Sequence, residues 1–91
     1  MKTRLHLVIS GRVQGVCFRM YAQEEAESVG VTGWIRNCPD GSVEVVVEGE
    51  EQEIGEFLAW CRHGPPHARV MGVREESLPA TGEFASFDIT R

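Results

Sequence analysis

The sequence is poor in basic residues. Its 91 residues include nine Lys and Arg against fourteen Asp and Glu, which gives a formal net charge of −5. The basic residues are scattered, whereas nucleic acids and anionic membranes are usually bound by a basic patch. We therefore expect neither nucleic acid nor membrane as a partner, and any anion-binding site has to be built locally.

Long apolar runs and paired cysteines are absent too. No segment approaches the roughly 20 apolar residues of a membrane-spanning helix, and the apolar stretch near the start is too short for the core of a signal peptide. The three cysteines, Cys17, Cys38 and Cys61, include no C-x-x-C pair, which argues against a disulfide framework or a zinc site. These features favour a cytoplasmic protein with reduced thiols.

The common phosphate-binding motifs are also missing. Neither G-x-x-x-x-G-K-[ST] nor G-x-G-x-x-G occurs, and no cysteine stands before an arginine at the C-x5-R spacing. His63 and His67 flank a Gly-Pro-Pro segment, which excludes the helix on which they would align as metal ligands. We expect no metal and no cofactor.

Hydrophobic periodicity divides the chain into alternating strands and helices. The predicted strands cover residues 4–10, 31–37, 42–49, 69–76 and 86–90, and the predicted helices cover residues 18–29 and 50–62. Gly30 ends the first helix, and a Gly-Pro-Pro segment ends the second. The length suits a single domain over residues 1–91.

The order β-α-β-β-α-β, followed by a short final strand, is typical of the split-βαβ or ferredoxin-like sandwich. In this α+β fold, two helices cover one face of an antiparallel sheet. The first two strands run parallel with the third between them, so their C-terminal ends lie at one edge, roughly 9–10 Å apart. The loop 11–18 and Asn37 are therefore expected to be neighbours.

The segment SGRVQGVCFRM, residues 10–20, begins a helix under unfavourable conditions. No capping side chain precedes Phe18, and Arg19 puts positive charge at the positive end of the helix dipole. A bound anion would resolve both features, since Gly11 and Gly15 let the backbone curl around it and Arg19 adds a charge-assisted pair. The alternative is an ordinary strand-to-helix loop with an exposed arginine.

Several motifs together resemble the acylphosphatase family. They are GRVQGVCFR at 11–19, GWIRN at 33–37 and DGSVEV at 40–45, and the resemblance continues through GPPHARV and FDITR over nearly the whole chain. It implies an enzyme that hydrolyses the carboxyl–phosphate bond of acyl phosphates without metal or cofactor. The least typical part of the match is Cys38-Pro39.

The resemblance also implies roles for individual residues. Arg19, which closes the first motif, would hold the substrate phosphate, and Asn37, which closes the second, would position the attacking water. These two are the expected catalytic residues. The backbone N–H groups expected to bind the phosphate belong to Gln14, Gly15, Val16, Cys17 and Phe18. Inorganic phosphate is expected as product and inhibitor, and we expect a monomer.

Two other functions stay open at this point. A non-catalytic binding module is one, because the ferredoxin-like scaffold hosts many unrelated activities. A carbamoyl-phosphate-handling domain shares the same motifs, although such domains belong to larger proteins. The physiological acyl phosphate is left open, as is a regulatory disulfide between Cys17 and Cys38.

Overall fold

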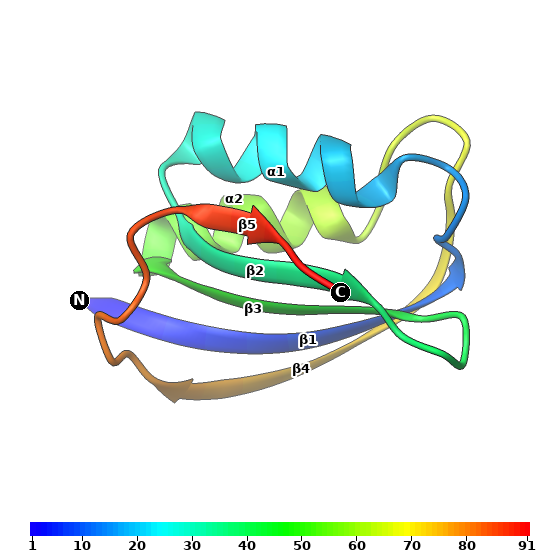
Figure 1. Ribbon diagram of the computed structural model, residues 1–91. Coiled ribbons are helices and arrows are strands. Elements are labelled where there is room, and N and C mark those ends of the chain that lie inside the picture. Colours follow the sequence, from blue (N-terminus) through cyan, green and yellow to red (C-terminus); the bar gives the residue numbers. More distant parts are fainter.

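The computed structural model describes residues 1–91 as a five-stranded sheet with two helices on one face (Figure 1). The elements are β1 (Lys2–Arg12), α1 (Phe18–Val29), β2 (Thr32–Asn37), β3 (Val43–Glu50), α2 (Glu51–Cys61), β4 (Arg69–Pro79) and β5 (Phe87–Ile89). The predicted ferredoxin-like sandwich is confirmed. No helix is long and apolar enough to span a bilayer.

Strand β3 lies at the centre of the sheet, whose order is β4-β1-β3-β2-β5. It runs antiparallel to both β1 and β2, so these two strands point the same way. Val43 pairs with Ile9 of β1 on one side and with Asn37 of β2 on the other. The C-terminal ends of β1 and β2 therefore lie at the same edge, as predicted.

The last strand makes the sheet mixed, which corrects the prediction of an antiparallel sheet. Strand β5 runs parallel to β2, with Ile89 beside Ile35. Strand β5 is parallel to β2 because of the path that the chain takes between β4 and β5. Strand β4 ends opposite Thr3, near the start of β1, and the following segment passes to the opposite edge of the sheet, so β5 enters where β2 also begins (Figure 1).

Strand β1 is longer than predicted, and this changes the role of Gly11. The strand continues to Arg12 through a register shift between Ser10 and Gly11. Gly11 has a φ of +120°, and a Cβ atom there would lie 2.2 Å from the carbonyl oxygen of Arg69 in β4. The expectation that Gly11 helps to curl an anion-binding loop was wrong, because close strand pairing requires this glycine; the loop begins at Val13.

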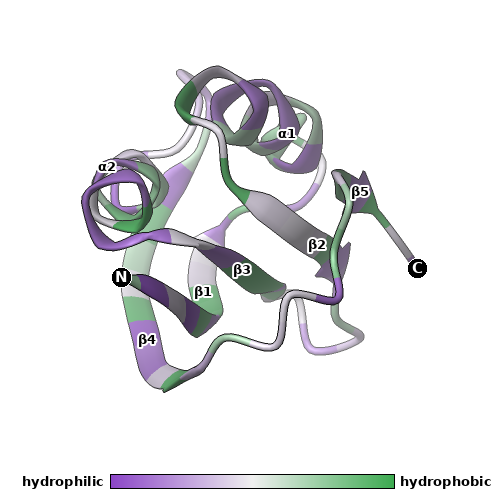
Figure 2. Ribbon diagram, turned by 90° about the vertical axis from the view of Figure 1, so that its left-hand side faces the viewer, coloured by the Kyte–Doolittle hydropathy of each residue, from purple (hydrophilic) through white to green (hydrophobic).

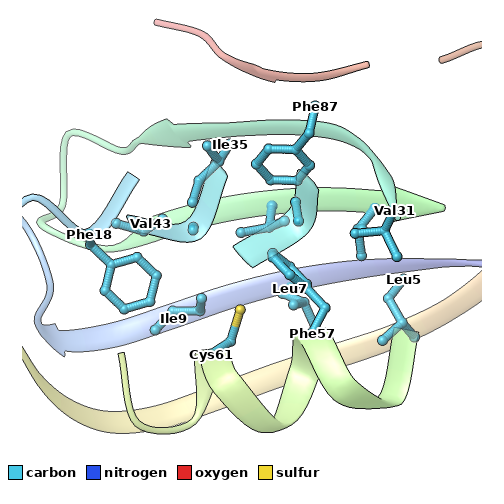
Figure 3. Packing of buried hydrophobic residues seen from close by; sticks show 14 of the residues in the cluster. Leu5, Leu7, Ile9, Phe18, Val31, Ile35, Val43, Phe57, Cys61 and Phe87 are labelled. Carbon is cyan, nitrogen blue, oxygen red and sulfur yellow. The ribbon is translucent and has the colours of Figure 1, made fainter. Parts of the chain in front are cut away.

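The core lies between the sheet and the helices. Viewed along the helices, α1 and α2 lie side by side on one face of the sheet (Figure 2). Phe57 of α2 packs beside Leu7 of β1 (Figure 3), and its ring centroid is 5.5 Å from that of Phe87 in β5. The buried residues of the strands and helices follow the predicted periodicities: Leu5, Leu7, Ile9, Val43, Val45, Val47, Phe18, Ala22, Ala26, Ile54, Phe57 and Cys61. Burial of each large apolar side chain contributes roughly 1.5–3 kcal/mol.

The opposite face of the sheet is covered at one place by the segment between β4 and β5. Glu48 of β3, which the strand pattern places on the solvent side, is only 4% exposed. Its carboxylate accepts hydrogen bonds from the backbone N–H groups of Thr81 at 2.8 Å and Gly82 at 3.0 Å, and from Arg4 Nε at 2.7 Å. Burial opposes ionisation, but these donors outweigh it and lower the pKa of Glu48 to about 2.

The lowered pKa of Glu48 predicts that the fold loses stability in acid. The ordinary pKa is 4.5 and the folded-state pKa is about 2, so the stabilisation is present above about pH 4.5 and is lost as the pH falls toward 2. We expect Glu48→Gln to unfold at lower urea concentration than the wild type at neutral pH. That difference should shrink at about pH 3, whereas Glu56→Gln, at an exposed position of α2, should unfold like the wild type at both. A constant difference across this range would contradict the assignment.

Candidate active site

A pocket of about 380 Å³ opens where the loop after β1, the start of α1 and the ends of β2 and β5 meet. In Figure 1 the loop after β1, the start of α1 and the end of β2 lie toward the right-hand side. Nine residues line the pocket: Val13, Gln14, Gly15, Cys17, Phe18, Arg19, Met20, Asn37 and Ile89. Of the residues predicted for the site, only Val16 is not among them, because its side chain is buried in the core.

The loop from Val13 to Cys17 has an unusual backbone. Gly15 and Cys17 both adopt left-handed conformations, with φ values of 75° and 62°. A Cβ atom at Gly15 would meet no atom within 4 Å, so the backbone conformation, and not lack of space, favours glycine there. Cys17 is the only non-glycine residue with positive φ, which is a strained position for an L-residue. Two left-handed residues thus define the backbone shape of the loop.

This shape leaves backbone donors free at the start of α1. The N–H groups of residues 14–18 donate no hydrogen bond to another backbone group, and the N-cap residue Cys17 makes no side-chain capping bond. The predicted absence of a helix cap is therefore confirmed. Free N–H groups at a helix N-terminus, together with the helix dipole, provide a binding site for an anion.

Arg19 and Asn37 bring two kinds of polar side chain to the same pocket. Arg19 is the only charged residue among the nine that line it, so the pocket is locally positive although the chain is acidic. No carboxylate lies within 4 Å of its guanidinium nitrogens, in contrast to Arg36, which pairs with Glu44 at 2.6 Å. Asn37 follows Ile35 by two residues in β2, which places both on the face of the sheet that the helices cover.

The side chain of Gln14 connects the two halves of the site. Its Nε2 atom donates hydrogen bonds to the carbonyl oxygens of Cys38 and Ser42, each at 2.8 Å. These carbonyls belong to the turn between β2 and β3, directly after Asn37. Asp40 holds the same turn, because its carboxylate accepts from the backbone N–H of Ser42 at 3.0 Å. The amide of Gln14 therefore links the loop after β1 to the strand end that carries Asn37.

The chain matches one protein family over nearly its whole length. The sequence model of one family, described as Acylphosphatase, matches residues 5–89. The chain belongs to the acylphosphatase family. It is 49% identical over 88 residues to an acylphosphatase of Methylococcus capsulatus, covering 97% of this chain and 96% of that one. It is 52% identical over 86 residues to one of Rubrobacter xylanophilus, covering 94% and 78%.

Solved structures of acylphosphatases share the whole fold. The crystal structure of an acylphosphatase from Bacillus subtilis superposes with a TM-score of 0.94 at 31% identity and covers all of both chains. The structure of one from Coxiella burnetii superposes with a TM-score of 0.92 at 36% identity, covering 98% of this chain and 93% of that chain. The resemblance seen in the sequence motifs is confirmed.

The segment least typical of acylphosphatases, Cys38-Pro39, leaves the turn intact. Cys38 takes part in it through its backbone, donating to the Ser42 carbonyl at 2.9 Å and accepting from the Gly41 N–H at 3.1 Å. The bond from Gln14 also goes to a backbone oxygen of Cys38. Because no side-chain atom of Cys38 is used, the unusual residue does not disturb the link to the loop. Cys17 and Cys38 are both free thiols.

Phe18, the first residue of α1, anchors the start of this helix in the core. This ring is 1% exposed and meets Trp60 of α2 edge-on, with centroids 5.4 Å apart. A Cβ atom at Gly64, in the loop after α2, would lie 2.7 Å from the ring. The core thus positions the helix end next to Arg19.

Three features of this pocket were missed by sequence reasoning. The side chain of Gln14 was given no role, because only the fold brings the two carbonyls to it. Met20 and Ile89 were not assigned to the site; they fall within the predicted helix 18–29 and the predicted strand 86–90. The parallel pairing of β5 with β2, which carries Ile89 to the pocket, has no signature in the local sequence.

The Gln14 link predicts a loss of function without loss of the fold. Gln14→Ala removes two hydrogen bonds that order the loop, each worth about 0.5–1.5 kcal/mol, so we expect kcat/KM for benzoyl phosphate to fall about 10–100-fold. Gln14→Glu should be worse, because a carboxylate cannot donate to the two carbonyls. Gln52→Ala, at an exposed position of α2, serves as the matched control. Unchanged kcat/KM in Gln14→Ala would show that the link is dispensable.

Proposed function

We propose that this chain hydrolyses acyl phosphates to a carboxylate and inorganic phosphate in the pocket at the start of α1. The observation that carries the proposal is a convergence. Four residues of the segment 14–18, in which no backbone N–H donates a hydrogen bond to another backbone group, line one pocket together with Arg19 and Asn37, in a chain of the acylphosphatase family. The backbone N–H groups and Arg19 would bind the phosphate, and Asn37 would bind the water.

The phosphate of the substrate would sit against the loop. Backbone N–H groups and an arginine form short, charge-assisted hydrogen bonds to phosphate oxygens, and Arg19 can bind two of them at once. No Asp or Glu lines the pocket, so the dianion meets no negative charge there. As the bond breaks, the same donors stabilise charge on the phosphoryl oxygens, which is the main requirement of phosphoryl transfer. Inorganic phosphate fits the same donors and should act as a competitive inhibitor.

Asn37 would hold the attacking water. The carbonyl oxygen of its amide can accept a hydrogen bond from water, and the uncharged group does not repel the dianion. The water oxygen attacks phosphorus, and the bond between phosphorus and the carboxyl oxygen breaks, releasing a carboxylate. One proton of the water passes to a phosphate oxygen of the substrate, and the other stays on the attacking oxygen. No separate general base is needed, because the carboxylate is a good leaving group.

Removal of the arginine should abolish most of the activity. We expect Arg19→Ala to lower kcat/KM for benzoyl phosphate roughly 10³–10⁵-fold, on the scale of arginines that stabilise phosphoryl charge. Arg19→Lys should recover little, because lysine lacks the planar fork of donors. The measurement is steady-state hydrolysis in the presence of EDTA, with circular dichroism to establish folding. Near-normal turnover in folded Arg19→Ala would refute the assignment.

Substitution of Asn37 should lower the rate of the chemical step without weakening phosphate binding. If it orients water, Asn37→Ala should lower kcat roughly 10²–10⁴-fold, the scale of lost positioning. Its inhibition constant for inorganic phosphate should stay within a few-fold of the wild type, since Arg19 and the loop remain. Asn37→Asp should also be slow, because its charge opposes the dianion. Both constants are measured on one preparation, and equal losses in both would make Asn37 a phosphate ligand or a structural residue.

A further inference from the structure

The end of β1 pairs with the start of β4 directly before the loop that lines the pocket (Figure 1, right-hand side). Up to Ser10 the two strands keep one register, which would set Arg12 opposite Val70. The register shifts directly after Ser10, and Arg12 stands opposite Arg69 instead. Bulges next to active sites commonly re-aim side chains. This bulge brings two arginines together, and we call Arg12 and Arg69 the arginine pair.

The arginine pair weakens the strand pairing that contains it. Residues directly opposite one another in an antiparallel pair have Cβ atoms roughly 4.5–5.5 Å apart, and like charges at such positions are destabilising. Both residues are exposed, and neither forms an ion pair, whereas Arg4, Arg36 and Arg62 each pair with a carboxylate. The two charges are therefore free to act on an anion in solution.

The edge of the sheet that carries the pocket is positive, although the chain is acidic. Three segments meet at this edge: residues 10–19, 37–43 and 62–69. Together they contain four arginines and one acid, Asp40, whose carboxylate accepts hydrogen bonds from Ser42. Of the four arginines, Arg62 has a carboxylate partner in Glu75. Arg19 and the arginine pair therefore give this edge three unpaired positive charges.

We propose that the arginine pair is an electrostatic steering site, which draws the phosphate dianion toward Arg19 and the loop. This inference rests on the proposed hydrolysis of acyl phosphates and adds two residues outside the pocket. Arg12 directly precedes Val13, which lines the pocket, and exposed charges act over about 10 Å at moderate salt. Positive charge beside a cleft raises the local concentration and the association rate of an anionic substrate.

The test removes both charges and varies the salt concentration. At about 0.01 M ionic strength, where charges act over about 30 Å, we expect the double variant Arg12→Gln, Arg69→Gln to bind inorganic phosphate about three- to tenfold more weakly than the wild type. Its kcat/KM for benzoyl phosphate should fall by a similar factor, with kcat within about twofold. At about 1 M sodium chloride, where charges act over about 3 Å, both differences should shrink below about twofold.

The matched control is another arginine of β4. Arg74 is exposed and forms no ion pair, but it stands opposite Val8, toward the middle of the strand. Arg69→Gln and Arg74→Gln therefore remove the same charge from the same strand, and only the first should weaken phosphate binding. The double variant should also unfold at a higher urea concentration than the wild type, because the repulsion within the arginine pair is gone.

The outcomes separate this inference from the function on which it rests. A wild type that does not hydrolyse benzoyl phosphate in the presence of EDTA would refute the proposed function, whereas phosphate binding, measured by calorimetry, needs no turnover. Unchanged phosphate affinity in the double variant at low salt, or an equal loss in Arg74→Gln, would overturn the steering role alone. A loss that persists at 1 M salt would overturn it too, because screening removes a long-range effect and leaves a direct contact.

Discussion

The pairing of β3 between β1 and β2 is the constraint on which the site depends. It aligns Val43 with Ile9 on one side and with Asn37 on the other, so the loop after β1 and the turn after β2 emerge at one edge. Two segments about 20 residues apart along the chain are thereby brought together. The hydrogen bonds from Gln14 to Cys38 and Ser42 then close the remaining gap. Local sequence shapes each segment, and the sheet sets their distance.

An acidic chain can bind an anion because electrostatic effects near a site outweigh those of distant charges. The net charge is −5, yet Arg19 is the only charged residue that lines the pocket. Exposed charges beyond about 10 Å are largely screened at physiological salt, so the carboxylates on other surfaces have little effect. Backbone N–H groups add donors without adding a flexible side chain. The strained conformation of Cys17 is of the kind that clusters at binding and active sites.

Periodicity in the sequence was sufficient for the order of elements and for the expectation that the loop after β1 and Asn37 lie at one edge of the sheet. Alternating Leu5, Leu7 and Ile9 predicted a strand with one buried face, and the absence of a cap before Phe18 predicted a free helix end. The predictions that failed concern contacts between segments that are far apart in the sequence. The close contact of Gly11 with Arg69, the burial of Glu48 and the parallel entry of β5 all depend on segments that are distant in sequence. No local pattern reports which segment will cover a strand.

A structure with inorganic phosphate bound tests the central claim most directly. Crystals of the wild-type chain soaked in phosphate should show the ion against the loop, with its oxygens within about 3.2 Å of backbone nitrogens of residues 14–18 and of the Arg19 guanidinium. The Asn37 amide should lie close to the ion but bind it through an ordered water. Phosphate bound elsewhere, or bound directly by Asn37 with Arg19 turned away, would contradict the account.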